Sequence, residues 1–171
     1  MPAYADQITL LMDTREKDGW QKLFQTPCVR GTLQVGDYSV AGLESLISIE
    51  RKSLSDLLGS LTAGRERFER EMKLGRHLAK FYLLIECNVS DLLVNDFGSL
   101  SKATPQSIWG SLWTWSHRYH VQILFGNDRQ SSARLCEAVL VAFAKEAVKL
   151  TDRMERASGK VSINAINDCF D

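Results

Sequence analysis

The apolar residues of this chain fall into two kinds of pattern, and the first predicts strands. Short apolar runs bounded by polar or turn-forming residues are typical of strands buried in a sheet. Two such runs flank the segment 41–44, Ala-Gly-Leu-Glu, whose composition predicts a hairpin connection. On this basis, strands are expected at residues 8–12, 32–35, 38–40, 46–51, 81–86 and 121–125.

The second pattern, apolar residues that recur every three or four positions, predicts helices. Two of the expected helices have recognisable start signals. Ser53 and Asp56 form a capping-box pattern with aspartate in place of glutamate, and Thr104-Pro105 places a capping residue before a proline. Helices are therefore expected at residues 16–25, 54–61, 65–79, 105–119 and from 127 or 128 to about 150, with one helical turn at 90–94.

The order of these elements favours one fold class. Strands come first, and alternating helices and strands follow, which predicts an α/β protein, a three-layer α/β/α sandwich around a central mixed sheet. A length of 171 residues suits a single domain. We expect this domain to span residues 1–150, followed by a C-terminal tail at 151–171 that is weakly ordered or a helical extension.

Composition excludes membrane and secreted classes. No run approaches the roughly 20 apolar residues that cross a bilayer, and the N-terminus lacks the pattern of a signal peptide. We therefore expect no membrane partner and an intracellular location, cytoplasmic or, in a eukaryote, nuclear. The four cysteines match no zinc-binding spacing, so reduced thiols are expected.

The charged residues balance overall, with 21 basic and 21 acidic side chains, but they are unevenly distributed. Residues 1–50 hold seven acids and four bases, whereas residues 51–80 hold eight bases and four acids. This order suits a metal site beside a track for phosphates. The second segment is either a plain solvated helix or a DNA-binding face, and the bases of that face would be Arg65, Lys73 and Arg76.

Two carboxylates and a lysine form the candidate chemical site. Glu50 and Lys52 lie two residues apart on an expected strand, so their side chains point to one face while Arg51 points to the other. Asp37 precedes Glu50 by thirteen residues across a hairpin-length segment, so the two carboxylates can meet. Such carboxylates hold Mg²⁺ or Mn²⁺, and a nearby lysine can stabilise charge during phosphodiester hydrolysis.

Longer motifs around this site resemble those of one nuclease family. The segment 36–38, Gly-Asp-Tyr, followed by 50–52, Glu-Arg-Lys, and Asp56, is similar to the GDx(n)ERKx3D signature of the XPF family of structure-selective DNA nucleases. The segment 12–16, Met-Asp-Thr-Arg-Glu, resembles the first-strand motif of that family. The resemblance covers about residues 8–150 and implies a restriction-endonuclease-like fold.

The resemblance implies a catalytic role for the acids and for the lysine. Asp37 and Glu50 would bind Mg²⁺ or Mn²⁺, and Lys52 would act on the attacking water or on the transition-state charge. Asp13 and Glu16 would be catalytic residues at the rim of the same site, where Asp13 would be a further metal ligand.

Other matching residues would support this chemistry. Arg15 and Arg51 would orient the acids or contact phosphate, with Arg51 counted among the catalytic residues. Asp56 would also belong to the catalytic set by positioning Lys52 or Arg51, unless it only caps a helix. Arg65 would contact the cleaved DNA strand or brace the site.

These features lead us to expect a Mg²⁺- or Mn²⁺-dependent DNA endonuclease that acts on branched, flap or fork-like DNA. Two alternatives are a non-catalytic DNA-binding or partner subunit on the same fold and a sequence-specific restriction-type endonuclease. Members of the family usually carry a tandem helix-hairpin-helix domain after the nuclease, and we expect none here. The preferred DNA structure is therefore left open.

The helix expected at 105–119 carries more aromatic surface than one core stripe uses. Trp109 and Trp113 share one face at helical spacing. A second face carries Ile108, Leu112 and Trp115. One face is expected to join the core, and the other is expected to form a homodimer interface, as in nuclease domains of the family. Packing under the 87–103 loop and stacking on DNA bases are the alternatives.

Overall fold

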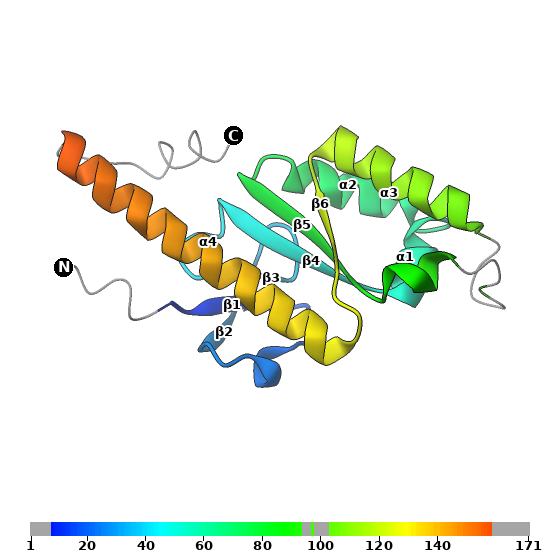
Figure 1. Cartoon of the computed structure of the whole chain (residues 1–171), viewed down its shortest axis with the longest axis horizontal. Helices are drawn as coiled ribbons and strands as arrows, with labels where there is room; N and C mark the ends of the chain where they lie inside the picture. The colour runs from blue at the N-terminus through cyan, green and yellow to red at the C-terminus, as the bar shows by residue number, and fades with distance from the viewer. Residues whose placement is uncertain (1–7, 94–96, 98–102, 159–171) are drawn as a thin grey trace.

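The computed structural model describes residues 8–93, 97 and 103–158, and its centre is one six-stranded sheet (Figure 1). The strands are β1 (Leu10–Asp13), β2 (Cys28–Gly31), β3 (Tyr38–Val40), β4 (Ile47–Ser53), β5 (Lys80–Glu86) and β6 (Gln122–Phe125). They lie in the order β2-β1-β3-β4-β5-β6. Because β3 is antiparallel to both neighbours while the other pairs are parallel, the sheet is mixed, as predicted.

Helices cover both faces of this sheet, and each face has its own apolar core. On one face lie α1 (Leu54–Ser60), α2 (Arg65–Gly75) and α3 (Pro105–Tyr119). The long helix α4 (Arg129–Ser158) crosses the other face (Figure 1). Two short 3-10 turns complete the described part, η2 (Gln21–Leu23) and η3 (Val89–Leu93). The predicted three-layer α/β/α sandwich is therefore confirmed.

Alternation along β4 directs polar side chains to a single face of the sheet. Ile47 and Ile49 are fully buried in the core beneath α4. Glu50 and Lys52 point to the opposite face, where the Lys52 ammonium lies 4.2 Å from the centre of the Phe68 ring of α2. A period of two residues thus separates apolar packing from the candidate chemistry on one strand.

Both predicted helix starts are confirmed. The Ser53 hydroxyl accepts a 3.1 Å hydrogen bond from the Asp56 backbone amide at the start of α1. At α3, Thr104 and Ser107 form a reciprocal capping box ahead of the buried helix positions. These caps satisfy amides that would otherwise lack partners, which fixes where each helix leaves its strand or loop.

Two expected elements differ from the prediction. The second strand is Cys28–Gly31 rather than residues 32–35, which form a loop that leads to Asp37. The side chains of Leu33 and Val35 belong to this loop and are buried in the protein. The alternation of apolar and polar residues at 32–35 therefore reflects packing of the loop rather than strand pairing. The helix expected at 16–25 is only the 3-10 turn η2, because Trp20 alone provides the deep anchor while Leu23 remains 38% exposed.

The last helix extends past the end of the expected domain. α4 reaches Ser158, so eight residues of the expected tail continue the helix, whereas 159–171 lie outside the described residues. No helix within the described residues is both long and apolar enough to span a bilayer. Cys28, Cys87 and Cys136 are free thiols, and the last two are buried.

Candidate active site

The antiparallel pairing of β3 with β4 brings Asp37 beside the end of β4. The Asp37 backbone amide donates to the Ile49 carbonyl at 2.9 Å, and the Arg51 backbone amide donates to the Asp37 carboxylate at 2.8 Å. The carboxylate is therefore anchored by the main chain of β4 itself. The meeting of Asp37 with the Glu50–Lys52 segment, expected from the hairpin spacing, is present in the structure.

Gly36 is required by the geometry of the turn that delivers Asp37. Its φ angle is +79°, in the left-handed region that side chains rarely adopt. A Cβ atom at this position would overlap the Ser48 hydroxyl and would lie 3.1 Å from the Ile49 carbonyl oxygen. The glycine of the motif thus allows the loop to approach β4 closely.

Glu50 and Lys52 form a buried ion pair on the same strand face. The Lys52 ammonium lies 2.9 Å from the Glu50 carboxylate, and both residues are less than a tenth exposed. Only one carboxylate oxygen of Glu50 accepts this bond. The other carboxylate oxygen and the lysine protons are therefore available for a ligand in the adjacent hollow.

A hollow of about 390 Å³ opens over these residues. Beyond the expected residues Arg15, Asp37, Glu50 and Lys52, it is lined by Gln34, Val35, Gly36, Arg67 and Glu71. Sequence reasoning missed Arg67 and Glu71. The signal was available on α2, where each of these residues directly precedes a buried core residue, Phe68 or Met72, and so borders the same helix face.

Burial and mutual repulsion perturb the two carboxyls of the hollow. Burial, reinforced by the charge of Glu50, raises the pKa of Asp37 to about 8. Burial also raises the pKa of Glu50, although the Lys52 charge opposes the shift. Ionisation of these two carboxyls is therefore unfavourable in the protein alone, and a divalent cation bound in the hollow would stabilise their ionised forms.

The donor chemistry of the hollow fits Mg²⁺ or Mn²⁺. Within the described residues, no three His, Cys, Asp or Glu side chains are clustered closely enough to hold a metal on their own. Mg²⁺ does not need such a cage, because it commonly binds one or two carboxylates and completes its shell with water and substrate phosphate. Asp37 and Glu50 supply that number of hard oxygen donors, with Glu71 bordering the same hollow.

Asp13, expected to be a catalytic metal ligand, lies behind the hollow. It is 1% exposed, and its carboxylate accepts hydrogen bonds from the Leu33 amide at 2.7 Å and from the Arg15 amide and guanidinium. Burial raises the pKa of Asp13, but these hydrogen bonds outweigh it and hold the pKa below its usual value. The structure therefore places Asp13 as the residue that positions Arg15, which does line the hollow.

Arg51 and Glu16 lie on the opposite strand face from Glu50. The Arg51 guanidinium contacts Glu86 at 2.5 Å and Glu16 at 3.2 Å, and it lies over the Trp20 ring. Neither Arg51 nor Glu16 lines the hollow. These side chains tie the loop after β1 to β4 and β5. The charge of Glu16 also adds to the burial that raises the pKa of Asp37 and of Glu50. A catalytic role for Arg51 and Glu16 stays a prediction.

Two further expected site residues are bound elsewhere. The Asp56 carboxylate accepts a 2.6 Å hydrogen bond from the Ser53 hydroxyl, and within the part of the chain that the structure describes no hydrogen bond or ion pair joins it to Lys52 or Arg51. Arg65 donates to Glu69 at 3.0 Å and to Ser111 at 3.1 Å, so it braces α2 against α3. Neither side chain lines the hollow, and the structure gives Asp56 the capping role that was the alternative.

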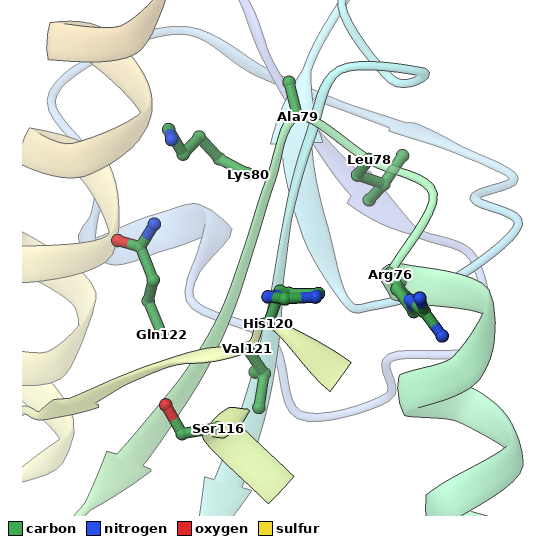
Figure 2. A pocket seen from close by; sticks show the side chains of 9 residues that line it. Arg76, Leu78, Ala79, Lys80, Ser116, His120, Val121 and Gln122 are labelled. Carbon is green, nitrogen blue, oxygen red and sulfur yellow. The ribbon is translucent and has the colours of Figure 1, made fainter. Parts of the chain in front are cut away.

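A second hollow, of about 460 Å³, lies where β5 and β6 begin and includes Arg76 (Figure 2). It also contains Lys80 and His120, but the Arg76 and Lys80 side chains point away from each other in Figure 2. The ends of α2 and α3 meet here, and helix C-termini disfavour anions. Arg76 lines this second hollow and does not line the candidate active site. Lys73 is an exposed residue of α2 that lines neither hollow.

Comparisons with known proteins agree with this fold. XPF from Aeropyrum pernix superposes with a TM-score of 0.62 at 20% identity, covering 80% of this chain and 61% of that chain. A complex of XPF from the same organism with DNA gives a TM-score of 0.64 at 20% identity, covering 81% of this chain and 66% of that chain. These likenesses show the fold.

Sequence comparison extends the agreement to the family. The DNA repair endonuclease XPF of Drosophila melanogaster is 47% identical over 55 residues, which are 32% of this chain and 5% of that protein. This chain therefore matches only about a twentieth of the fly protein's length. The family model of the ERCC4 domain matches residues 12–139, which include the end of β1, the hollow, all of α3 and β6 and the first part of α4. The chain belongs to the ERCC4 domain family.

Proposed function

We propose that this chain is a Mg²⁺- or Mn²⁺-dependent endonuclease that hydrolyses phosphodiester bonds in branched, flap or fork-like DNA. The observation that carries the proposal is the pair of carboxylates, half-buried Asp37 and buried Glu50, with Lys52 in one open hollow. Family membership and the name of the fly relative, a DNA repair endonuclease, support this activity. DNA as substrate places the proposed work inside the cell, in the cytoplasm or in a nucleus.

Five of the residues that line the hollow have a part in the proposed chemistry. A divalent cation held by Asp37 and Glu50 would polarise the scissile phosphate and lower the pKa of a water molecule. The Arg51 amide keeps the Asp37 carboxylate fixed during the reaction. Lys52, held 2.9 Å from Glu50, can donate to the attacking water or to a phosphate oxygen. Arg15 and Arg67, which also line the hollow, suit the flanking phosphates.

The proposal is tested by a cleavage panel. We expect cutting of flap and fork substrates in Mg²⁺ or Mn²⁺, much weaker cutting of intact duplex, and none in EDTA. Single-stranded DNA and a four-way junction complete the panel. No cleavage under any condition would support a non-catalytic subunit instead, and cutting of intact duplex at one fixed sequence would support a restriction-type enzyme.

We further propose that the protein forms a homodimer through the outer face of α3. Ile108, Leu112 and Trp115 are fully buried in the core, so that face of the helix is used. Trp113 remains 55% exposed and is stacked on Trp109, which contacts Phe125 of the edge strand β6. An exposed aromatic group beside a sheet edge is suited to a self-complementary interface.

Sedimentation of the Trp113→Glu variant tests this interface. We expect the wild type to sediment as a dimer and the variant as a monomer, because a charge would have to be buried. Leu74→Glu is the matched control, since Leu74 is 56% exposed on α2, and it should remain dimeric. A monomeric wild type would contradict the proposal.

A further inference from the structure

Acids of the same helix compensate part of the positive charge along α2, the surface that was expected to bind DNA. The helix carries four bases and three acids. Arg65 is paired with Glu69 at 3.0 Å, and Arg67 lies 3.9 Å from Glu71. A phosphate chain that followed α2 would therefore meet little net positive charge.

A different hollow, on the far side of the loop after β1, is more strongly basic. It has a volume of about 380 Å³, and four bases and one acid line it. The acid, Asp18, is matched by Arg129, whose guanidinium lies 2.9 Å from its carboxylate. Lys17, Lys22 and Arg30 then remain as the uncompensated charges of this hollow.

These three bases have no acidic partner in the part of the chain that the structure describes. Lys17 and Lys22 are exposed and belong to no ion pair there. Arg30 donates to the backbone carbonyls of Thr14 and Glu16, so its charge is held in place without being cancelled. Fixed and uncompensated cations in a hollow are suited to an anionic chain.

The loop at 14–18 separates this basic hollow from the candidate active site. Arg15 lines the active-site hollow, whereas Lys17 lines the basic one. Two residues of chain span at most about 7 Å, which equals about two steps of the rise along the DNA helix axis. Arg51 bonds both the Glu16 carboxylate and the Asp18 carbonyl, so the loop is fixed relative to Glu50.

We propose that the hollow formed by Lys17, Lys22 and Arg30 binds the DNA backbone on one side of the cleaved bond. The strand would lie across the 14–18 loop, from Arg15 to the edge strand β2, rather than along α2. This inference rests on the proposed nuclease function, and it names the surface that holds the substrate. Its contacts are with phosphates, so it contributes affinity and register but no base sequence preference.

A matched pair of double variants tests the track. Lys17→Ala/Lys22→Ala removes two bases of the hollow, and Arg70→Ala/Lys73→Ala removes two exposed bases of α2. Each is made in the full chain and titrated against a labelled forked duplex in EDTA at several salt concentrations. Both variants lose the same charge, so a difference between them reports position rather than net charge.

We expect the first variant alone to bind more weakly and with a smaller salt dependence. The slope of log affinity against log salt should fall by about 2, because each phosphate contact contributes about 0.9. When the salt concentration rises from about 50 to about 200 mM, both proteins lose affinity for DNA. The factor lost by the wild type should be about ten times the factor lost by the variant. In Mg²⁺, its KM for forked DNA should rise while kcat at saturating DNA stays near the wild-type value.

An unchanged slope in the Lys17→Ala/Lys22→Ala variant, or a larger effect of the α2 variant, would overturn the inference. Cleavage by the wild type separates this failure from failure of the proposed function. If the wild type cuts forked DNA while the first variant binds like it, the nuclease assignment stands and the track is wrong. If the wild type neither binds nor cuts any DNA, both are wrong.

Discussion

Asp37→Asn is expected to slow DNA cleavage by about 10³-fold while the protein stays folded. The substitution keeps the shape of the side chain and its acceptor for the Arg51 amide, but it removes the charge that would bind a divalent cation. Rates under single-turnover conditions on a forked substrate provide the measurement. Cutting at the wild-type rate would show that Asp37 does not belong to the chemical site.

The thermal stability of this variant is the control for its folding. The pKa of Asp37 predicts whether the variant melts above or below the wild type. Because the folded-state pKa is raised from 3.8 to about 8, the folded state holds the proton more tightly than the unfolded chain. The stability from this carboxyl is full below about pH 4 and is lost as pH rises through about 8. In EDTA above pH 8, Asp37→Asn should therefore melt at a higher temperature than the wild type.

Added Mg²⁺ should reverse this order. A cation that binds the ionised carboxylates stabilises only the folded wild type, and it does so increasingly as pH rises. We expect its effect on the melting temperature to be lost in Asp37→Asn. A Mg²⁺ effect of equal size in both proteins would place the metal elsewhere.

Arg51→Met is expected to lower the free energy of unfolding by about 3 kcal/mol, the usual cost of breaking a buried ion pair. Both partners are largely buried, with side-chain exposures of 14% for Arg51 and 12% for Glu86. The variant would leave Glu86 and Glu16 without their shared cation, and the contact with Trp20 would also change. Urea denaturation gives the free energy directly.

A second substitution distinguishes a charge effect from a packing effect. Arg51→Met/Glu86→Gln should regain part of the lost stability, because the unpaired carboxylate is then removed. Arg67→Met is the matched control. The Arg67 side chain is 73% exposed and lies 3.9 Å from Glu71, so its loss should change the free energy of unfolding by less than about 1 kcal/mol. A fully stable Arg51→Met variant with a lost kcat would instead make Arg51 a catalytic residue.

Local sequence patterns were sufficient to predict the centre of the site. The period of two along a strand placed Glu50 and Lys52 together, and a hairpin-length spacing brought in Asp37. Both inferences depend on short-range geometry alone. The same geometry correctly separated Arg51 from its two neighbours. Its bond partners, Glu16 of the loop after β1 and Glu86 of β5, come from distant segments and were not predictable.

Residues whose roles depend on long-range packing were placed less well. Asp13 and Arg65 matched family motifs, but the burial of Asp13 and the contact of Arg65 with Ser111 depend on how distant segments meet. The segment 32–35 was expected to be a strand because its alternation was read as pairing. In the fold, the Leu33 amide bonds the Asp13 carboxylate instead of a neighbouring strand, and a loop results.

The opposite orientations of Glu50 and Arg51 have a practical consequence for protein engineering. Side chains that face α4 from β4 contribute to packing, whereas those that face α2 border the hollow. A library that seeks a more heat-resistant protein can therefore vary the interface between α4 and the sheet while Glu50 and Lys52 keep their positions. Arg51→Pro is the exception to avoid, because proline has no amide hydrogen to hold the Asp37 carboxylate.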